Sequence, residues 1–422
     1  MMKTEYKHPI DRYFSRNTAS ISAVELFWGL AIPVLFESTF LQVFLREIGA
    51  SNLTVGLIPA ILSVGIMLFS LMSAYLTSHL ERKKMWVILT HAFASLPLIL
   101  FGLAVVHTDA GYRVGLFLVC YSLLALMLGL TMPMWQNFTV MIFSPEKAIK
   151  GLSIMITTQI TTRLIGGLVI FKSVEKYSFS IESAAVIFIA AGLLCLTGSF
   201  FFIPVKESAG ENSFQPKNRH NFRTLAESAK TIIRNRNFMF YLLSSVEMYA
   251  TITVIAFYAN FAVEWRGIEK SAAAGLFVSF IYLAGILINI LVGWMGLFKL
   301  KTKFIIARSA ALCGTVAVLF SSTLPQFLAA SFLIGISRGI NQSAHVHAVK
   351  KLSGLHDATD YFAISLLLVF PFSFGLPSLS GMFLDISRGY GSLSYIIVFS
   401  VLAILQACTL MLTLKSDFMN SP

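Results

Sequence analysis

The sequence predicts an all-α membrane protein with twelve transmembrane helices in two six-helix halves. Of its 422 residues, 56% are hydrophobic and only 12% are charged, about half the charged fraction of an ordinary soluble domain. Because about twenty apolar residues span a bilayer, this composition is enough for on the order of twelve spans. Twelve apolar runs are present, and one long polar connection divides them into two sets of six.

The twelve runs are joined mostly by short connections. They cover residues 23–45, 53–77, 85–106, 113–135, 151–171, 183–203, 238–262, 272–298, 303–323, 326–348, 361–384 and 392–414. With the N-terminus inside, the inner loops and tails hold 22 Lys and Arg residues, the outer loops hold 7, and 3 lie within runs. Basic residues collect on the cytoplasmic side of membranes, so this distribution predicts cytoplasmic termini.

Five parts follow from these runs. They are a cytoplasmic tail (1–22), a six-helix bundle (23–203), a cytoplasmic central loop (204–237), a second bundle (238–414) and a short cytoplasmic tail (415–422). Apolar residues of the central loop follow helical spacing, with basic residues opposite, which predicts an amphipathic helix on the inner membrane surface. A flexible tether is the alternative. We expect a monomer surrounded by lipid in a plasma or bacterial inner membrane.

Several other functions are excluded. The net charge of +12 is explained by basic inner loops, so we expect no nucleic-acid partner. The four cysteines lie far apart within apolar runs, which is not a metal or redox spacing. The absence of a Gly-Lys dipeptide excludes a P-loop. We therefore expect no metal and no cofactor.

Charged residues near the middle of a run cost a few kcal/mol each in a bilayer. Four residues lie there: Glu37, Arg163, Glu247 and Arg338. Glu25 and Arg308 lie at run ends, from which long side chains reach the interface, and they are set aside. The four central charges either form ion pairs between helices or line a midplane cavity. In the cavity, an arginine would bind an anionic or polar substrate group.

Glu37 and Glu247 are the candidates for proton coupling. Burial disfavours the charged form of a carboxyl group, which suits proton transfer near neutral pH. Glu37 is preferred because Pro33, four residues earlier, frees a backbone carbonyl and loosens the helix at that point.

Polar stripes on three runs predict the substrate-binding residues. A polar face toward lipid would be costly, so these side chains must face protein or water. The candidates are Arg338, Asn341, Gln342 and His345 in the tenth run, Gln159 and Arg163 in the fifth, and Gln136 and Asn137 at the end of the fourth. Hydrogen bonding between helices is the alternative.

A hydrolase-like pattern, Gly335-Ile336-Ser337-Arg338-Gly339, lies in the tenth run. The nucleophile elbow needs a strand, a turn and a helix, whereas this pattern lies within a span. Two glycines four residues apart are also a close-packing motif of membrane helices. We expect no enzyme activity, and an intramembrane hydrolase that uses Ser337 is the alternative from another class.

Three short segments resemble elements of the major facilitator superfamily. Between helices two and three, that family carries roughly G-x-L-A-D-R-x-G-R-K. Residues 74–83 match it at Leu76, Arg82 and Lys83, with Ser78 in place of Asp and Glu81 in place of Gly. Lys150-Gly151 and the stretch from Gly49 to Gly56 resemble the family's entries to helices five and two.

This resemblance implies alternating access around a midplane site lined mainly by helices 1, 4, 7 and 10. The implied gating loop contains Ser78, Glu81, Arg82 and Lys83. We therefore predict a secondary active transporter, a symporter or an antiporter, of a small polar or anionic solute or a drug-like compound. Coupling to protons is expected, and an uncoupled facilitator of the same fold is the alternative.

Overall fold

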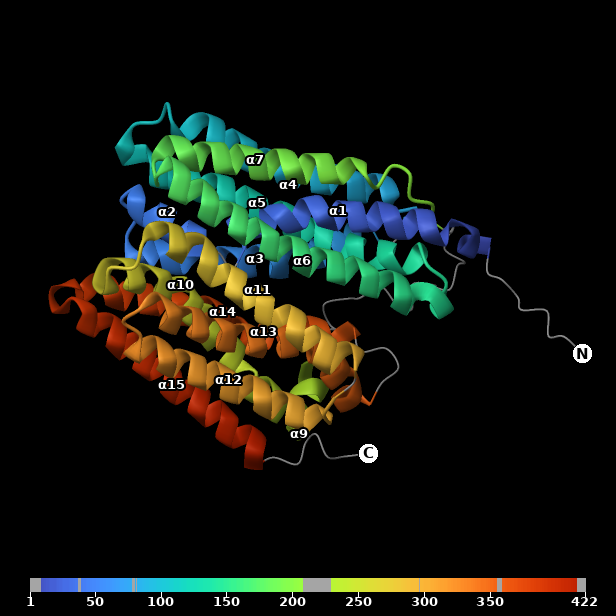
Figure 1. Ribbon diagram of the computed structural model, residues 1–422. Coiled ribbons are helices and arrows are strands. Elements are labelled where there is room, and N and C mark those ends of the chain that lie inside the picture. Colours follow the sequence, from blue (N-terminus) through green and yellow to red (C-terminus); the bar gives the residue numbers. More distant parts are fainter. Residues whose placement is uncertain are drawn as a thin grey trace, which may run out of the picture.

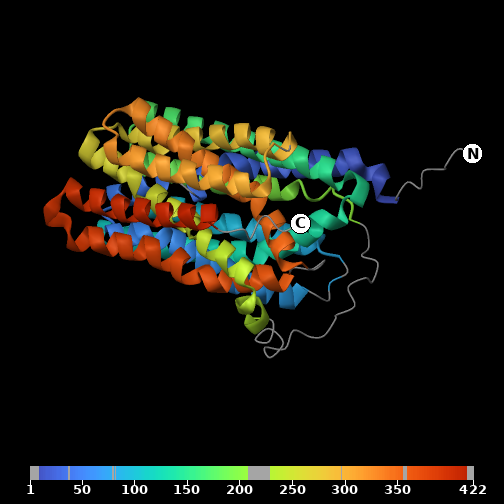
Figure 2. The ribbon, with the colours of Figure 1, turned by 90° about the horizontal axis from the view of Figure 1, so that it is seen from below.

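The protein is a bundle of long helices arranged as two halves. The computed structural model describes residues 9–36, 39–77, 80, 82–207, 229–295, 297–354 and 359–415. Every regular element in these ranges is helical, so the predicted fold class is confirmed. Figure 1 shows the first half in blue to green beside the second half in yellow to red. In Figure 2 the second half lies toward the viewer.

The first half contains α1 (Phe14–Leu35), α2 (Thr39–Glu47), α3 (Asn52–Thr77), α4 (Lys84–Val105), α5 (Ala110–Met141), α6 (Pro145–Tyr177) and α7 (Ile181–Phe200). The second half contains α9 (Arg236–Ser244), α10 (Val246–Arg266), α11 (Phe277–Ile288), α12 (Leu300–Phe320), α13 (Leu324–Ser353), α14 (Thr359–Ile386) and α15 (Ser392–Lys415). Short helical turns flank several of them, including η1 (Pro9–Tyr13) before α1 and the π-helical η2 (Ala272–Leu276) and η3 (Asn289–Trp294) around α11. Local sequence sets some ends: Pro145 begins α6, and left-handed Gly267 and Gly354 follow α10 and α13.

Eleven helices in the described ranges are long and apolar enough to cross a membrane. The predicted span that is missing from these eleven is the tenth, residues 326–348. It corresponds to α13, whose polar residues lower its mean hydropathy. Its packing places it within the bundle nevertheless. A Cβ atom on Gly335 would lie 2.3 Å from the carbonyl oxygen of Ile281 on α11, so the glycine pair serves close helix packing.

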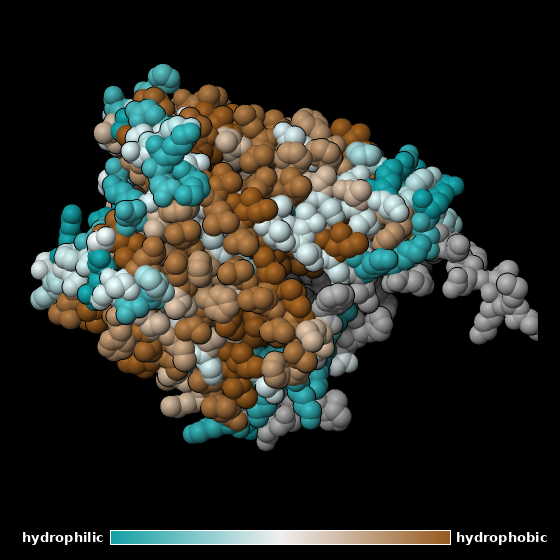
Figure 3. All heavy atoms as spheres, viewed as in Figure 1, coloured by the Kyte–Doolittle hydropathy of each residue, from teal (hydrophilic) through white to brown (hydrophobic). Residues whose placement is uncertain are grey.

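The surface matches a membrane environment. Figure 3 shows a broad hydrophobic band between two hydrophilic ends. Large apolar side chains such as Leu100, Val186 and Ile404 are exposed within the spanning helices. A contiguous apolar surface of this kind is stable only against lipid. We call the end at which α1 begins the inner end, as the charge distribution predicts.

The start of α1 differs from the sequence expectation and changes the interpretation of Glu25. The helix begins at Phe14, within the segment 1–22 that we predicted to be a tail. Its first turns are polar but bonded within the protein, since buried Asn17 donates to the carbonyl oxygens of Ile142 and Lys206 at 2.8 Å each. Hydropathy does not detect such a segment. Glu25 therefore lies about three helical turns inside α1, and setting it aside as a run-end residue was wrong.

The central loop is described only in part. Residues 229–234 are helical, with Ile232 buried and Lys230 and Arg234 exposed, in agreement with an amphipathic segment over those residues. The remaining predicted apolar positions, Phe222, Leu225 and Ala226, lie outside the described residues.

The two halves approach most closely where α3 crosses α14 and where α6 crosses α11. At the first crossing, a Cβ atom on Gly381 of α14 would lie 2.3 Å from the carbonyl oxygen of Asn52. At the second, a Cβ atom on Gly275 would lie 2.6 Å from the carbonyl oxygen of Gly167. Glycine is required at these positions because the two backbones touch.

We predict that Gly381→Leu separates α3 from α14 at the outer end, because the new side chain overlaps the Asn52 carbonyl. The distance between spin labels at exposed Ser51 and Arg388 should increase and broaden in double electron-electron resonance. Gly375→Leu is the matched control on the same helix, since nothing lies within 4 Å of its Cβ position. An unchanged distance in the Gly381 variant would contradict close packing at this crossing.

Candidate transport site

A large cavity lies between the two halves. Its volume is about 560 Å³, within the usual range for sites that enclose small organic ligands. Helices α1 to α6 of the first half and α10, α13 and α14 of the second contribute to its wall. A solute in the cavity would therefore contact both halves at once.

The cavity wall is largely apolar and carries a limited set of polar groups. Aromatic and aliphatic side chains such as Trp28, Ile32, Ile58 and Tyr121 form much of it. The polar and charged side chains include Glu25, Gln42, His91, Gln159, Arg163, Ser337, Arg338, Asn341, Gln342 and His345. The combination suits a solute with an apolar body and at least one charged or hydrogen-bonding group.

Most of the predicted substrate-binding residues lie on this wall. Arg338, Asn341, Gln342 and His345 of α13 line the cavity, as do Gln159 and Arg163 of α6. Gln136 and Asn137 are not among the lining residues and are exposed near the inner end of α5. Polar side chains at a helix end are in contact with water, so Gln136 and Asn137 are hydrated there without a cavity. Glu37 lies outside the described residues, and its role stays a prediction.

In the first half, Glu25 and Arg163 face the cavity together. Glu25 is 5% exposed and accepts a hydrogen bond from Nε2 of Gln159, one turn before Arg163 on α6. Arg163 attracts Glu25 electrostatically, and its guanidinium lies 5.7 Å from the ring centre of Tyr282 in the other half. The buried Nε of Arg163 has no hydrogen-bond partner in the described structure. Part of the bonding capacity of this arginine is therefore unused.

In the second half, Glu247 lies behind the cavity wall. It is fully buried and accepts hydrogen bonds from Ser337 at 2.8 Å, Thr251 at 2.9 Å and Asn341 at 3.1 Å. Those three side chains come from α10 and α13 and themselves line the cavity. Glu247 therefore holds the polar faces of two helices in place without lining the cavity itself.

Arg308 of α12 completes this second cluster. It is 1% exposed, donates from Nε to the carbonyl oxygen of Ser244 at 2.9 Å and from Nη2 to the Ser244 hydroxyl at 2.8 Å. Glu247 attracts it electrostatically. Setting Arg308 aside as a residue that reaches the interface was therefore wrong, because a buried carboxylate on a neighbouring helix offsets its charge.

Both histidines on the wall already have partners. His91 Nδ1 lies 2.7 Å from the carbonyl oxygen of Val87, and its ring packs edge-on against Trp28 and Trp135. His345 Nδ1 lies 2.6 Å from the hydroxyl of Tyr241. These contacts fix the two rings in the wall.

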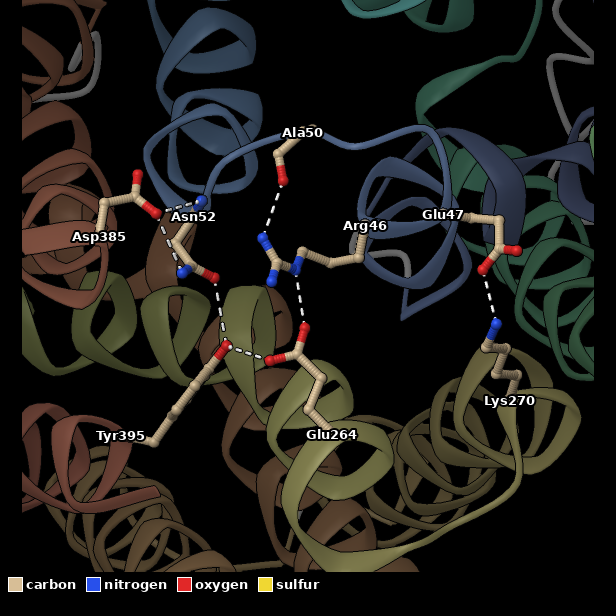
Figure 4. Close-up of polar contacts among 8 residues, drawn as sticks. All are labelled: Arg46, Glu47, Ala50, Asn52, Glu264, Lys270, Asp385 and Tyr395. Carbon is tan, nitrogen blue, oxygen red and sulfur yellow. Dashed lines mark hydrogen bonds and ion pairs between the residues drawn. The ribbon is translucent and has the colours of Figure 1, made fainter. Parts of the chain in front are cut away.

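Polar contacts join the two halves at the outer end of the bundle, as Figure 4 shows. The carboxylate of Asp385 on α14 accepts hydrogen bonds from the backbone N–H groups of Asn52 and Leu53, each at 2.8 Å. These are the first N–H groups of α3, which otherwise lack partners, and the helix dipole favours a negative charge there. Asp385 thus joins the second half to the first.

Two ion pairs lie beside this contact (Figure 4). Arg46 on α2 pairs with Glu264 on α10 at 2.7 Å. Lys270 pairs with Glu47 at 2.6 Å, with both side chains partly exposed. Polar contacts of this kind can break and re-form, because water replaces each partner when the two surfaces separate.

The predicted gating loop is only partly described. Ser78 and Glu81 lie outside the described residues, and Arg82 is exposed. The backbone N–H of Lys83 donates to the carboxylate of Glu207 at 3.0 Å, within the first half. Burial lowers the pKa of the Lys83 side chain, and the nearby Glu207 opposes that shift.

These features are those of a membrane transporter: two helical halves line a central cavity, and polar contacts join the halves at the outer end. The chain belongs to the Major Facilitator Superfamily, whose family model matches residues 26–364. No curated protein matches the sequence.

The chain is a transporter rather than an enzyme. Ser337 lies within the long helix α13 and donates its hydroxyl to Glu247, without the strand and turn of a nucleophile elbow.

Solved transporter structures share the fold. A mutant of the nucleoside transporter NupG has 10% identity and a TM-score of 0.75, covering 94% of this chain and 98% of its own. A bacterial homologue of the human lysosomal transporter Spinster, in an inward-facing conformation, has 13% identity and a TM-score of 0.61, covering 98% and 95%. A POT family transporter has 13% identity and a TM-score of 0.67, covering 98% of each chain. At these identities the likeness concerns the fold alone.

We predict that Asp385→Asn opens the outer end more often, because the amide carries no charge and offers one acceptor oxygen where the carboxylate offers two. A cysteine at Leu45, in a variant without the four native cysteines, should react faster with a membrane-impermeant maleimide added from outside. Glu47→Gln should change the rate little, since exposed ion pairs contribute about 0–1 kcal/mol. Equal rates in both variants would show that Asp385 does not hold the outer end closed.

We also predict that Glu247→Gln destabilises the protein much more than Glu25→Gln. Loss of the Glu247 charge removes the attraction that offsets part of the buried positive charge of Arg308, and it disturbs the three hydrogen bonds that Glu247 accepts. Thermal unfolding in detergent should show a clearly lower midpoint for the Glu247 variant. Equal midpoints would mean that Glu247 is dispensable for the fold.

Proposed function

We propose that this chain is a secondary active transporter of a small organic anion with an apolar body, coupled to protons. The observation that carries this proposal is one arginine from each half on the wall of one cavity, Arg163 on α6 and Arg338 on α13. We further propose a monomer in a plasma or bacterial inner membrane, surrounded by lipid, with both termini cytoplasmic.

The two arginines favour an anion on electrostatic grounds. Like charges that face one cavity repel, and the low dielectric around a membrane cavity strengthens that repulsion. An anion between them relieves it and contacts both halves. Binding of the solute would thereby lower the energy of conformations in which the halves close around it, which is the requirement for alternating access.

The apolar wall narrows the class of solute. An inorganic anion would leave most of a cavity of about 560 Å³ without contacts. Aromatic and aliphatic side chains favour a solute that buries apolar surface, at roughly 25 cal/mol per Å². Asn341, Gln342 and Gln159 would supply hydrogen bonds to further polar groups of that solute.

The proposal is tested by uptake into proteoliposomes. Aromatic and aliphatic carboxylates are compared with their primary amides, with and without a pH gradient. Carboxylate accumulation that needs the gradient supports a proton-coupled anion transporter. Equal flux without the gradient identifies an uncoupled facilitator, and transport of the amides alone would refute an anionic substrate.

We predict that Arg163→Gln and Arg338→Gln each weaken carboxylate binding by roughly 10- to 100-fold, because a hydrogen bond to a charged group contributes about 1.5–3 kcal/mol. Binding of the matching amide should change little. Lys350→Gln, at an exposed position on α13, is the control. Loss of folding in both arginine variants would instead favour ion pairs that hold the helices together.

A further inference from the structure

We propose that Glu25, rather than Glu247, binds the coupling proton, and that this arrangement makes proton and anion binding cooperative. The proposal rests on the proposed function for the anion, and the assignment of the proton to Glu25 can be tested without any solute. Sequence reasoning favoured Glu37 and Glu247 for this role and set Glu25 aside.

The two glutamates occupy corresponding places in the two halves. Glu25 lies about three turns after the start of α1 at Phe14, and Glu247 lies about three turns after the start of α9 at Arg236. Each belongs to the first span of its half. A comparison of their surroundings therefore isolates what differs between two groups at similar depth.

Glu247 has the surroundings of a permanent carboxylate. Three donors bond to its two oxygens. An ionised carboxylate only accepts hydrogen bonds, so it matches three donors. A proton on Glu247 would need an acceptor, yet the amide nitrogen of Asn341 can only donate, and one of the two hydroxyls would have to reverse its bond to accept it. It would also leave the buried positive charge of Arg308 without compensation.

Glu25 has the surroundings of an exchangeable site. It lines the cavity, whereas Glu247 does not. One oxygen, Oε2, accepts from Gln159, and the other, Oε1, has no hydrogen-bond partner among the described residues. A proton can therefore reach Oε1 from the cavity and leave the bond to Gln159 intact.

Arg163 is the charged group that acts on Glu25. It lies on α6, the helix most extensively packed against α1. The charged residues of the other elements packed against α1 lie at their ends: Asp11 and Arg12 in η1, Arg46 and Glu47 in α2, and Glu182 in α7. The remaining titratable groups on the wall are His91 on α4 and Tyr121 on α5, with Tyr249, Arg338 and His345 in the other half. Protonation of Glu25 therefore changes the charge beside Arg163 above all.

The sign of the coupling follows. Ionised Glu25 offsets part of the attraction of Arg163 for an anion, and a proton on Glu25 restores it. Each ligand thus strengthens binding of the other by the same factor, as thermodynamic linkage requires. A carrier that changes between its two conformations mainly when both ligands are bound or both are absent moves them in the same direction. The site would therefore perform symport of an anion and a proton.

The test follows the proton itself by infrared spectroscopy. The purified full-length protein in lipid nanodiscs is titrated with acid, and the carbonyl stretch of protonated carboxyl groups is recorded. The difference between the wild type and Glu25→Gln should contain a band that grows as acid is added. Glu25→Asp should restore a titrating band. Absence of such a band from the difference spectrum would overturn the proposal.

Substitution of one residue that contacts each glutamate assigns the band to Glu25 or to Glu247, while both glutamates are kept. Gln159→Leu removes the hydrogen bond to Glu25 and should shift the midpoint of the band. Thr251→Val removes one donor from Glu247 and should leave the midpoint unchanged. The opposite pattern would assign the proton to Glu247 and refute the proposal.

A failure of carboxylate uptake in proteoliposomes would refute the proposed function, while the titration would still decide whether Glu25 binds the proton.

Discussion

Burial of charge within a membrane-spanning bundle is the constraint on which this structure depends. Each charge there must be neutralised, hydrogen-bonded or kept in contact with water. Glu247 and Arg308 meet this requirement inside the second half, behind the cavity wall. Glu25 and Arg163 meet it at the cavity wall of the first half, and in each half one buried nitrogen of the arginine, Nε of Arg163 and Nη1 of Arg308, has no hydrogen-bond partner among the described residues. The cavity therefore lies where charges cannot be enclosed by protein alone.

The two halves share a helical plan but use it differently. In the second half, a fully bonded carboxylate holds α10 and α13 together and presents Ser337 and Asn341 to the cavity. A saturated network of this kind has one favoured protonation state. In the first half, the corresponding carboxylate has one bond and lies open to the cavity. The wall of the second half is thus held by a hydrogen-bond network, whereas the first half keeps a carboxylate oxygen without a partner among the described residues.

Hydropathy and charge distribution were sufficient to predict the helical class and the number of spans, and three short segments that resemble family motifs predicted the family. They failed where polar residues are satisfied by tertiary contacts. The first turns of α1 carry Ser, Arg, Asn and Thr, and the bonds of buried Asn17 to Ile142 and Lys206 explain why this polar segment packs within the protein as a helix. That error moved Glu25 to the end of a predicted span. Likewise, Gln136 and Asn137 seemed placed to line a cavity because sequence spacing does not show that the inner end of α5 is exposed.

The sequence by itself determined that α13 carries a polar face, because residues three and four positions apart must share one side of a helix. It also determined that charge lies at midplane depth, because depth follows from position along a span. Only the tertiary structure decided which charge meets which, since partners such as Glu247 and Arg308 come from helices distant in the chain. The cavity, its outer closure by Asp385 and the open oxygen of Glu25 arise from the same cause: they depend on how helices cross, and helix crossing is a property of the assembled bundle.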